Sequence, residues 1–359
     1  MKRLTPLRVE KMILSGSNYD FRTLRLMGGL TSSAWNMNMK NRKLPRLDED
    51  KATRQMLLPF CRLAPGEIWT DHQRGHRVGC VDAANPSQIQ ELMAGYKAQL
   101  AIHDPPYNLV AFATQSVVDF VAWCEKWIET TNASLADDAS LYVWLGADQN
   151  EGFQPLPDFM LMMRRFRDFA SRSFITMRNQ RGYGTQKNWM AVRQECLFYV
   201  KGNPDFTVQY TDIPKILRGY YKEINGKKTE NMERSKSGYI RPGNVWVDVQ
   251  QVFYRMEENV NGCYTQKPLK CIERLLLASS KEADVVIDFF GHSGTTLVAA
   301  EQLNRQCFIC DTDPVYCEII IRRLERLRRL GKTGWQNGNP FEKELDGVEE
   351  PGQLVLELW

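Results

Sequence analysis

The chain has 359 residues, of which 43% are hydrophobic and 25% are charged. This length and balance fit one large globular domain with smaller elements attached, and they exclude a low-complexity chain or a small disulfide-stapled one. The formal net charge of +4 says little about partners, but residues 1–60 carry 12 Lys and Arg against 5 Asp and Glu, while the end of the chain is acidic. Such asymmetry favours a polyanion bound on one face, and charges spread over a solvated surface are the alternative.

The sequence predicts neither membrane insertion nor secretion. Its apolar runs are only strand-length, and the first residues lack the apolar core of a signal peptide. The nine cysteines are scattered, which favours reduced thiols in a cytoplasmic protein. Cys307 and Cys310 have a metal-ligand spacing, but strand residues three apart point to opposite faces, so we predict no metal site.

Hydrophobic periodicity predicts alternating strands and helices along most of the chain. Strands are expected at 76–81, 99–102, 140–145, 173–177, 284–289 and 306–310. Helices are expected at 86–97, 117–130, 156–167, 269–280, 295–303 and 314–330. Alternation of this kind predicts an α/β domain with a mostly parallel sheet covered by helices on both faces.

The remaining segments differ in composition from this domain, which we place at 64–335. Residues 1–63 form a basic N-terminal extension, and residues 336–359 form an acidic C-terminal tail. Residues 203–262 are polar, basic and rich in turns, so we expect a loop-rich insertion there. In the helix at 314–330 we expect Ile319, Ile320 and Leu324 to face inward and the arginines to face solvent, with nucleic-acid contact as the alternative.

The motif Asp104-Pro105-Pro106-Tyr107 follows the predicted strand 99–102 directly. A carboxylate and a neighbouring carbonyl can each accept one hydrogen of an aromatic amine, which favours a pyramidal, nucleophilic nitrogen. Two prolines fix the backbone that carries the Pro105 carbonyl, and Tyr107 offers a face for stacking on a base. An ordinary strand-to-loop turn remains the alternative. His103 should point to the opposite face from Asp104 and not act as a base.

A second motif, the segment 288–296, combines an acidic residue, glycines and threonines after a predicted strand. Gly291 and Gly294 allow close approach of a ligand, and Thr295 begins a helix whose N-terminus favours an anion. Asp311 ends the next strand, 23 residues after Asp288, where a carboxylate can accept hydrogen bonds from both ribose hydroxyls. By themselves these residues fit any adenosine-containing cofactor.

Taken together, the two motifs in this order resemble the β group of DNA amino-methyltransferases, and five ordered segments between about residues 64 and 330 share the resemblance. The resemblance implies a Rossmann-like methyltransferase fold in circularly permuted order, with S-adenosylmethionine as cofactor and double-stranded DNA as substrate. The implied catalytic residues are Asp104, Pro105, Pro106 and Tyr107. The implied cofactor-binding residues are Asp82, Thr265, Lys267, Asp288, Phe290, Gly291, Ser293, Gly294, Thr295 and Asp311. One departure is His292, where the family usually has glycine; we expect its ring to face solvent, and a narrowed loop is the alternative.

The resemblance places target recognition in the insertion at 203–262. The candidate DNA-binding residues, chosen as basic or aromatic side chains in exposed loops, are Arg178, Arg181, Tyr183, Lys227, Lys228 and Arg241. An exposed loop without a ligand is the alternative for the segment 178–184. The resemblance also allows a homodimer, a restriction endonuclease partner and a bacterial or phage origin, none of which the sequence decides.

Four functions remain open at this point. The motif begins with Asp, which within this family favours the 6-amino group of adenine, and the 4-amino group of cytosine is the alternative. His292 leaves room for a catalytically weak DNA-binding relative. The fold type by itself also allows a nicotinamide-dependent oxidoreductase, although the motif at Asp104 would have no role in one.

Overall fold

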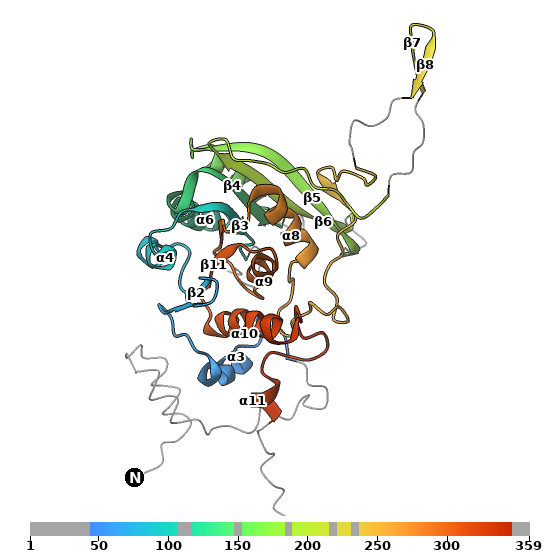
Figure 1. The fold of residues 1–359 in the computed structure, drawn as a ribbon. Helices are drawn as coiled ribbons and strands as arrows, with labels where there is room; N and C mark the ends of the chain where they lie inside the picture. The colour runs from blue at the N-terminus through green and yellow to red at the C-terminus, as the bar shows by residue number, and fades with distance from the viewer. Residues whose placement is uncertain are drawn as a thin grey trace, which may run out of the picture.

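The computed structural model describes residues 44–106, 116–146, 153–183, 189–214, 221–230 and 237–346, and its ribbon is shown in Figure 1. The helices are α3 Lys51–Leu57, α4 Pro86–Met93, α6 Val117–Ser134, α7 Leu156–Met163, α8 Leu269–Ser279, α9 Thr295–Gln302, α10 Pro314–Leu330 and α11 Glu342–Asp346, with a 3-10 turn η3 at Leu58–Phe60. The strands are β1 Ile68–Thr70, β2 Arg77–Cys80, β3 Ala98–His103, β4 Leu135–Leu145, β5 Phe169–Tyr183, β6 Ala191–Lys201, β7 Tyr221–Ile224, β8 Lys227–Glu230, β9 Val245–Trp246, β10 Val285–Asp288 and β11 Gln306–Asp311.

Nine of these strands form one sheet, in the order β1-β2-β11-β10-β3-β4-β6-β5-β9. The strands from β2 to β4 in this order are parallel, whereas β1 and β6 run antiparallel to their neighbours. The predicted mostly parallel sheet is therefore confirmed. Strands β11 and β10, from the end of the chain, lie between β2 and β3 from its beginning. This interleaving brings the two motifs of the sequence to adjacent strands.

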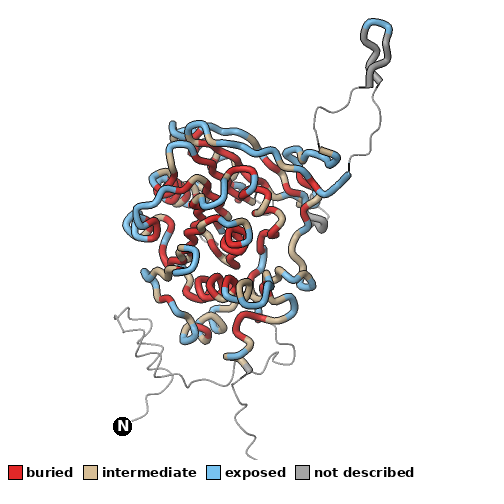
Figure 2. The backbone as a smooth tube through the Cα atoms, in the orientation of Figure 1, coloured by how far each residue is buried: buried red, intermediate tan, exposed pale blue. Residues whose placement is uncertain are grey.

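Helices cover both faces of the sheet, as predicted (Figure 1). On one face α4, α6 and α7 bury Trp127 and Phe159 against β3 and β4. On the other face α8 and α9 bury Leu275 and Val298 against the same strands, and Figure 2 shows the buried chain concentrated along these layers. Burying one large apolar side chain contributes about 1.5–3 kcal/mol, so these layers hold the strand ends in a fixed arrangement.

Several elements differ in length from their predictions. Helix α4 stops at Met93 instead of continuing to residue 97, because Ala94 and Gly95 adopt left-handed backbone angles of φ 47° and 85°. Helix α7 likewise stops at Met163. Strands β5 and β6 have 15 and 11 residues, and their antiparallel pairing forms a long hairpin that the short predicted strand at 173–177 did not indicate.

The basic side of α10 is not the solvated face that the sequence predicted. Arg323 has 0% of its surface exposed. Arg328 donates hydrogen bonds to both carboxylate oxygens of Asp71, each at 2.8 Å, and to Glu301. The arginine side chains of this helix therefore link it to its neighbours.

Residues on both sides of the predicted domain boundaries pack against α10. Leu47 and Leu57 are fully buried, although they precede residue 64, and Phe341 is fully buried, although it follows residue 335. The boundaries themselves stay predictions. Among the described residues, no helix is both long and apolar enough to cross a membrane.

Candidate active site

Four aspartates lie at the carboxyl ends of four adjacent strands. Asp311 and Asp288 are the last residues of β11 and β10, Asp104 directly follows β3, and Asp82 comes two residues after the end of β2. Ligands of parallel α/β sheets bind beyond this edge, so the sheet order gathers the predicted catalytic and cofactor-binding aspartates at one place.

Asp104 forms an ion pair with a lysine from a distant part of the chain. The Lys267 Nζ atom donates a hydrogen bond to Asp104 Oδ2 at 2.6 Å, and it also lies 5.3 Å from the centre of the Trp144 ring. Lys267 is 6% exposed. The second oxygen, Oδ1, is buried and has no hydrogen-bond partner among the described residues. Burial raises the pKa of Asp104 above its ordinary value, and the charge of Lys267 opposes that rise.

The other residues of the first motif are placed as follows. Pro105 is buried and Pro106 is exposed, while Tyr107 lies outside the described residues. His103 points away from Asp104, into the layer below α6. Its Nε2 atom lies 3.0 Å from the hydroxyl of Thr131, and its Nδ1 atom accepts a hydrogen bond from the amide of Phe289. Burial lowers the pKa of His103 to about 3, so this imidazole is a neutral core residue.

The glycine-rich loop between β10 and α9 is held close to β11 and α10. Gly291 donates a backbone hydrogen bond to the Cys310 carbonyl at 2.7 Å. A Cβ atom on Gly291 would lie 2.6 Å from Ile320 Cδ1 and 2.8 Å from Ile309 Cγ1, and Gly294 has φ 76°. Both positions therefore require glycine, one for space and one for its backbone angle.

We expect Gly291→Ala to destabilise the fold by about 1–3 kcal/mol, because the added methyl group overpacks a closed contact. Chemical denaturation monitored by circular dichroism measures this change. Gly243→Ala is the matched control, since nothing lies within 4 Å of the Cβ position at Gly243. Equal stability of the two variants would contradict the assignment of Gly291 to a closed loop.

Two carboxylates fix the shape of this loop. Asp288 Oδ1 accepts a hydrogen bond from the amide of Phe290 at 3.0 Å, and its Oδ2 accepts one from the Thr296 hydroxyl at 2.5 Å. Asp311 Oδ2 accepts a hydrogen bond from the amide of His292, and its Oδ1 accepts one from the amide of Asp313, both at 3.0 Å. Burial raises the pKa of Asp288 to about 7 and that of Asp311 to about 6.

His292 occupies the loop differently from the sequence expectation. Its backbone is left-handed, with φ 43°, and its half-buried ring lies 4.9 Å from the ring of Tyr316 and does not point freely to solvent. Burial lowers the pKa of His292 to about 4, so the ring is neutral at ordinary pH. The hydrogen bond from its amide to Asp311 holds the His292 backbone in this conformation.

The remaining cofactor candidates fall around this loop. Ser293 and Thr295 are buried, with their hydroxyl oxygens 3.2 Å apart. Phe290 is half-buried against Trp127, at a ring distance of 5.2 Å. Asp82 and Thr265 are exposed, and Thr265 has a left-handed φ of 60°.

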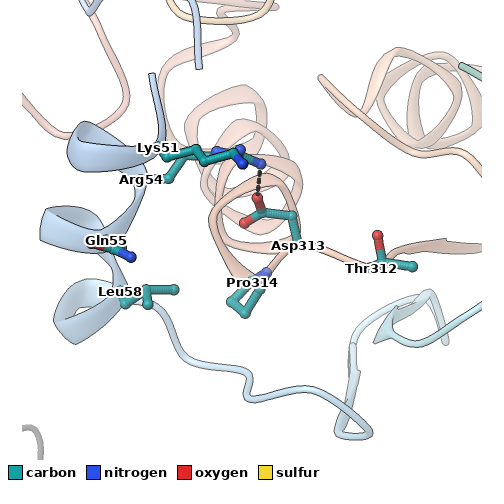
Figure 3. A pocket seen from close by; sticks show the side chains of 7 residues that line it. All are labelled: Lys51, Arg54, Gln55, Leu58, Thr312, Asp313 and Pro314. Atoms are coloured by element: carbon teal, nitrogen blue, oxygen red, sulfur yellow. Dashed lines mark hydrogen bonds and ion pairs between the residues drawn. The ribbon is translucent and has the colours of Figure 1, made fainter. Parts of the chain in front are cut away.

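A separate open pocket lies just beyond β11, between α3 and the start of α10 (Figure 3). Asp313 in this pocket caps α10 through the amide of Val315 and pairs with Arg54 at 2.8 Å. Two of its three charged side chains, Arg54 and Asp313, are paired with each other, and none of the predicted site residues lines it. Its lining residues are Lys51, Arg54, Gln55, Leu58, Thr312, Asp313 and Pro314.

The candidate DNA-binding residues are only partly placed. Arg178 on β5 and Arg241 before β9 are exposed. Arg178 lies opposite Arg193 in the β5–β6 register, a cross-strand pair of like charges. The side chains of Arg181, Tyr183, Lys227 and Lys228 lie outside the described part of the structure.

Sequence reasoning did not foresee two contacts around the candidate site, those of Lys267 and Arg323. It assigned Lys267 to the cofactor and gave no reason to expect the contact with Asp104, because the two are 163 residues apart. It also placed Arg323 in solvent. The sequence did contain a signal that Arg323 is buried. It lies four residues after Ile319 and three after Ile320, both of which face inward, so it lies on the same side of the helix.

Known proteins share sequence with most of this chain. Residues 98–322 match the family model N6_N4_Mtase, described as DNA methylase. Type II methyltransferase M1.MboII of Moraxella bovis is 26% identical over 267 residues, which cover 70% of this chain and 96% of that protein. DNA adenine methyltransferase YhdJ of Escherichia coli is 26% identical over 232 residues, covering 63% of this chain and 76% of that protein.

Among solved structures, the chain is similar to the cytosine-N4-specific PvuII DNA methyltransferase, with 15% identity and a TM-score of 0.49 over 68% of this chain and 84% of that one. The family match spans both motifs and more than half of the chain, and it overturns the alternative of a nicotinamide-dependent oxidoreductase. The chain belongs to the N6_N4_Mtase family of DNA methylases, as a β-group DNA amino-methyltransferase of the adenine-N6/cytosine-N4 type.

Proposed function

We propose that this protein transfers a methyl group from S-adenosylmethionine to the N6 amino group of adenine within a specific sequence of double-stranded DNA. The observation that supports the proposal most directly is the hydrogen bonding of the two Asp104 carboxylate oxygens. One of its oxygens is held by Lys267, and the other is buried without a partner among the described residues. A buried acceptor that lacks a donor fits an incoming amino hydrogen.

The residues beside Asp104 fit the proposed cofactor. Gly291 and Gly294 let the loop before α9 pack directly against β11 and α10, which fixes its backbone at the strand ends. The half-buried carboxylate of Asp311 lies at the adjacent strand end, with lone pairs left for two ribose hydroxyls. The N-terminus of α9 faces the same edge and favours the carboxylate of the methionine part. Asp82, Thr265 and Phe290 are further proposed contacts.

When bound, the cofactor supplies an electrophilic methyl group on a sulfonium. The protein's own residues orient the target amine so that its nitrogen becomes nucleophilic. Asp104 Oδ1 accepts one hydrogen of the target amine and the Pro105 carbonyl accepts the other, which directs the nitrogen lone pair toward the methyl group. As the nitrogen–carbon bond forms, the sulfur–carbon bond would break and leave the sulfur as a neutral thioether, and the amine proton would pass to Asp104, whose pKa burial raises. Tyr107 is proposed to stack on the flipped base.

We propose that DNA lies along the β5–β6 hairpin and the segment 203–262. The exposed Arg178 and Arg241 would contact phosphates or bases, together with Arg181, Tyr183, Lys227 and Lys228. Relatives such as M1.MboII, a Type II methyltransferase, support a role in restriction and modification. We also propose a homodimer, because the chain resembles this family.

Cofactor binding should depend on pH through Asp311. Its pKa without ligand is about 6, and only the ionised carboxylate can accept hydrogen bonds from both ribose hydroxyls. Protonation therefore weakens binding as the pH falls, and the Kd at pH 5 should be about tenfold higher than at pH 7. Calorimetric titration with S-adenosylmethionine between pH 5 and 7 measures this, below the range in which the cofactor's own amino group titrates. Asp311→Ala serves as the control, and an equally steep pH dependence in that variant would rule out Asp311 as the responsible group.

Analysis of the reaction product distinguishes adenine from cytosine. Unmethylated duplex DNA is incubated with the protein and S-adenosylmethionine, digested to nucleosides and analysed by mass spectrometry. We expect N6-methyladenine, because Asp begins the motif at position 104 where cytosine-N4 enzymes of this family more often have Ser. N4-methylcytosine alone would keep the mechanism and overturn the assigned base.

A further inference from the structure

The cofactor loop rests on a buried arginine that the mechanism above does not use. Arg323 on α10 is fully buried and donates four hydrogen bonds, to the carbonyls of Ser293 at 2.9 Å, Glu258 at 3.1 Å and Thr333 at 2.6 Å and to the Thr295 hydroxyl at 3.0 Å. All four acceptors are neutral oxygen atoms. Burial lowers the pKa of Arg323 to about 10, so the side chain is still charged at neutral pH.

Burying a cation without a paired carboxylate is unfavourable unless its donors are satisfied by well-placed acceptors. Here those acceptors come from three separate segments, namely the loop before α9, the chain before α8 and the turn after α10. The planar guanidinium can reach all three segments at once because its three nitrogen atoms are spread apart. A lysine ammonium donates from one nitrogen atom only. The arrangement therefore fixes these segments relative to each other.

The same hydrogen bonds continue to the catalytic carboxylate. The Thr295 hydroxyl, which accepts from Arg323, donates to the backbone carbonyl of Lys267 at 3.2 Å. The side chain of Lys267 then donates to Asp104. A continuous chain of contacts thus runs from Arg323 through the cofactor loop to the residue that is to orient the amine.

We propose that Arg323 is a positioning residue of the methyltransferase site, which sets the conformation of the cofactor loop and its distance from Asp104 by holding Ser293 and Thr295. This inference rests on the proposed cofactor site. It predicts that the geometry of the guanidinium, and not merely its positive charge, determines cofactor affinity.

The test is the Kd for S-adenosylmethionine of the full chain, measured by calorimetry alongside the melting temperature. Arg323→Lys keeps the charge and should raise the Kd about tenfold or more, because at least one hydrogen bond to the loop is lost. Arg328→Lys is the matched control on the same helix, since Arg328 contacts Asp71 and Glu301 and not the loop. Both variants should have a lower melting temperature than the parent. Arg328→Lys should nevertheless keep the Kd for S-adenosylmethionine within about twofold of the parent value.

A folded Arg323→Lys variant with an unchanged Kd, or an equal rise in both variants, would overturn the proposal. If Arg323→Lys does not fold, Thr295→Val and Thr295→Ser replace it. Valine removes the hydroxyl that accepts from Arg323 and should raise the Kd, whereas serine keeps it and should restore binding; an unchanged Kd for Thr295→Val would then count against the proposal. Failure of the parent chain to bind S-adenosylmethionine would instead reject the proposed function, so the two failures are distinguishable.

Discussion

Asp104→Asn should lower methyl transfer by about 10²–10⁴-fold while leaving cofactor binding within about threefold of the parent protein. The asparagine oxygen can still accept from Lys267, so the buried lysine keeps a partner and the fold is maintained. The asparagine NH2 group then takes the place of Oδ1. This group is a hydrogen-bond donor, so it can neither accept a hydrogen bond from the target amine nor receive the amine proton. Single-turnover methylation with labelled S-adenosylmethionine measures the rate, and calorimetry measures the affinity.

Glu125→Gln is a suitable control for this prediction. Glu125 also pairs with a cation, Arg165, at 2.8 Å, but the pair is partly exposed and lies outside both motifs and the segment 203–262. Loss of that charge should leave the rate of methylation unchanged. If Asp104→Asn methylated DNA as fast as the Glu125→Gln variant, Asp104 could not be the group that receives the amine proton.

Asp311→Ala should raise the Kd for S-adenosylmethionine by about 10²–10⁴-fold. Two hydrogen bonds from ribose hydroxyls to a carboxylate contribute about 1.5–3 kcal/mol each, and both are lost. The loop is also loosened, because the amides of His292 and Asp313 lose their acceptor. Calorimetric titration gives the affinity, and methylation at saturating cofactor should recover most of the parent rate, since Asp104 is intact.

The matched control for Asp311 is Asp313→Ala, two residues along the chain. Asp313 caps α10 and pairs with Arg54, so its loss should lower the melting temperature. It should not change the affinity for the cofactor. A comparable loss of affinity in both variants would mean that the pocket of Figure 3, and not the edge at Asp311, holds the ligand.

Local patterns were sufficient to predict most of the sheet and its helices. The strand that ends at Asp311 and the helix at 314–330 were placed to within one residue, because long apolar runs and a Pro at the helix start determine them locally. The end of α4 was wrong because Ala94 is a poor indicator of a left-handed cap. The length of the β5–β6 hairpin was missed because residues 178–182 are polar or glycine and give no alternating apolar pattern.

The site was only partly predictable for a different reason. Asp104, Gly291 and Asp311 each belong to a short motif, so their types and spacing were visible in the sequence. The role of Arg323 depends on three backbone carbonyls supplied by other segments, and a carbonyl has no sequence signature. The pairing of Lys267 with Asp104 depends on the sheet order, which brings residues from both halves of the chain to one edge.

The central claim is that this chain methylates an amino group in DNA and that Asp104 enables the reaction. The most direct measurement is base-resolved modification mapping of DNA from a methylation-free host that expresses the chain, beside a host that expresses Asp104→Asn. We expect N6-methyladenine in one short sequence, present with the parent chain and absent with the variant. Unmodified DNA in both hosts, with both proteins folded and able to bind S-adenosylmethionine, would contradict it.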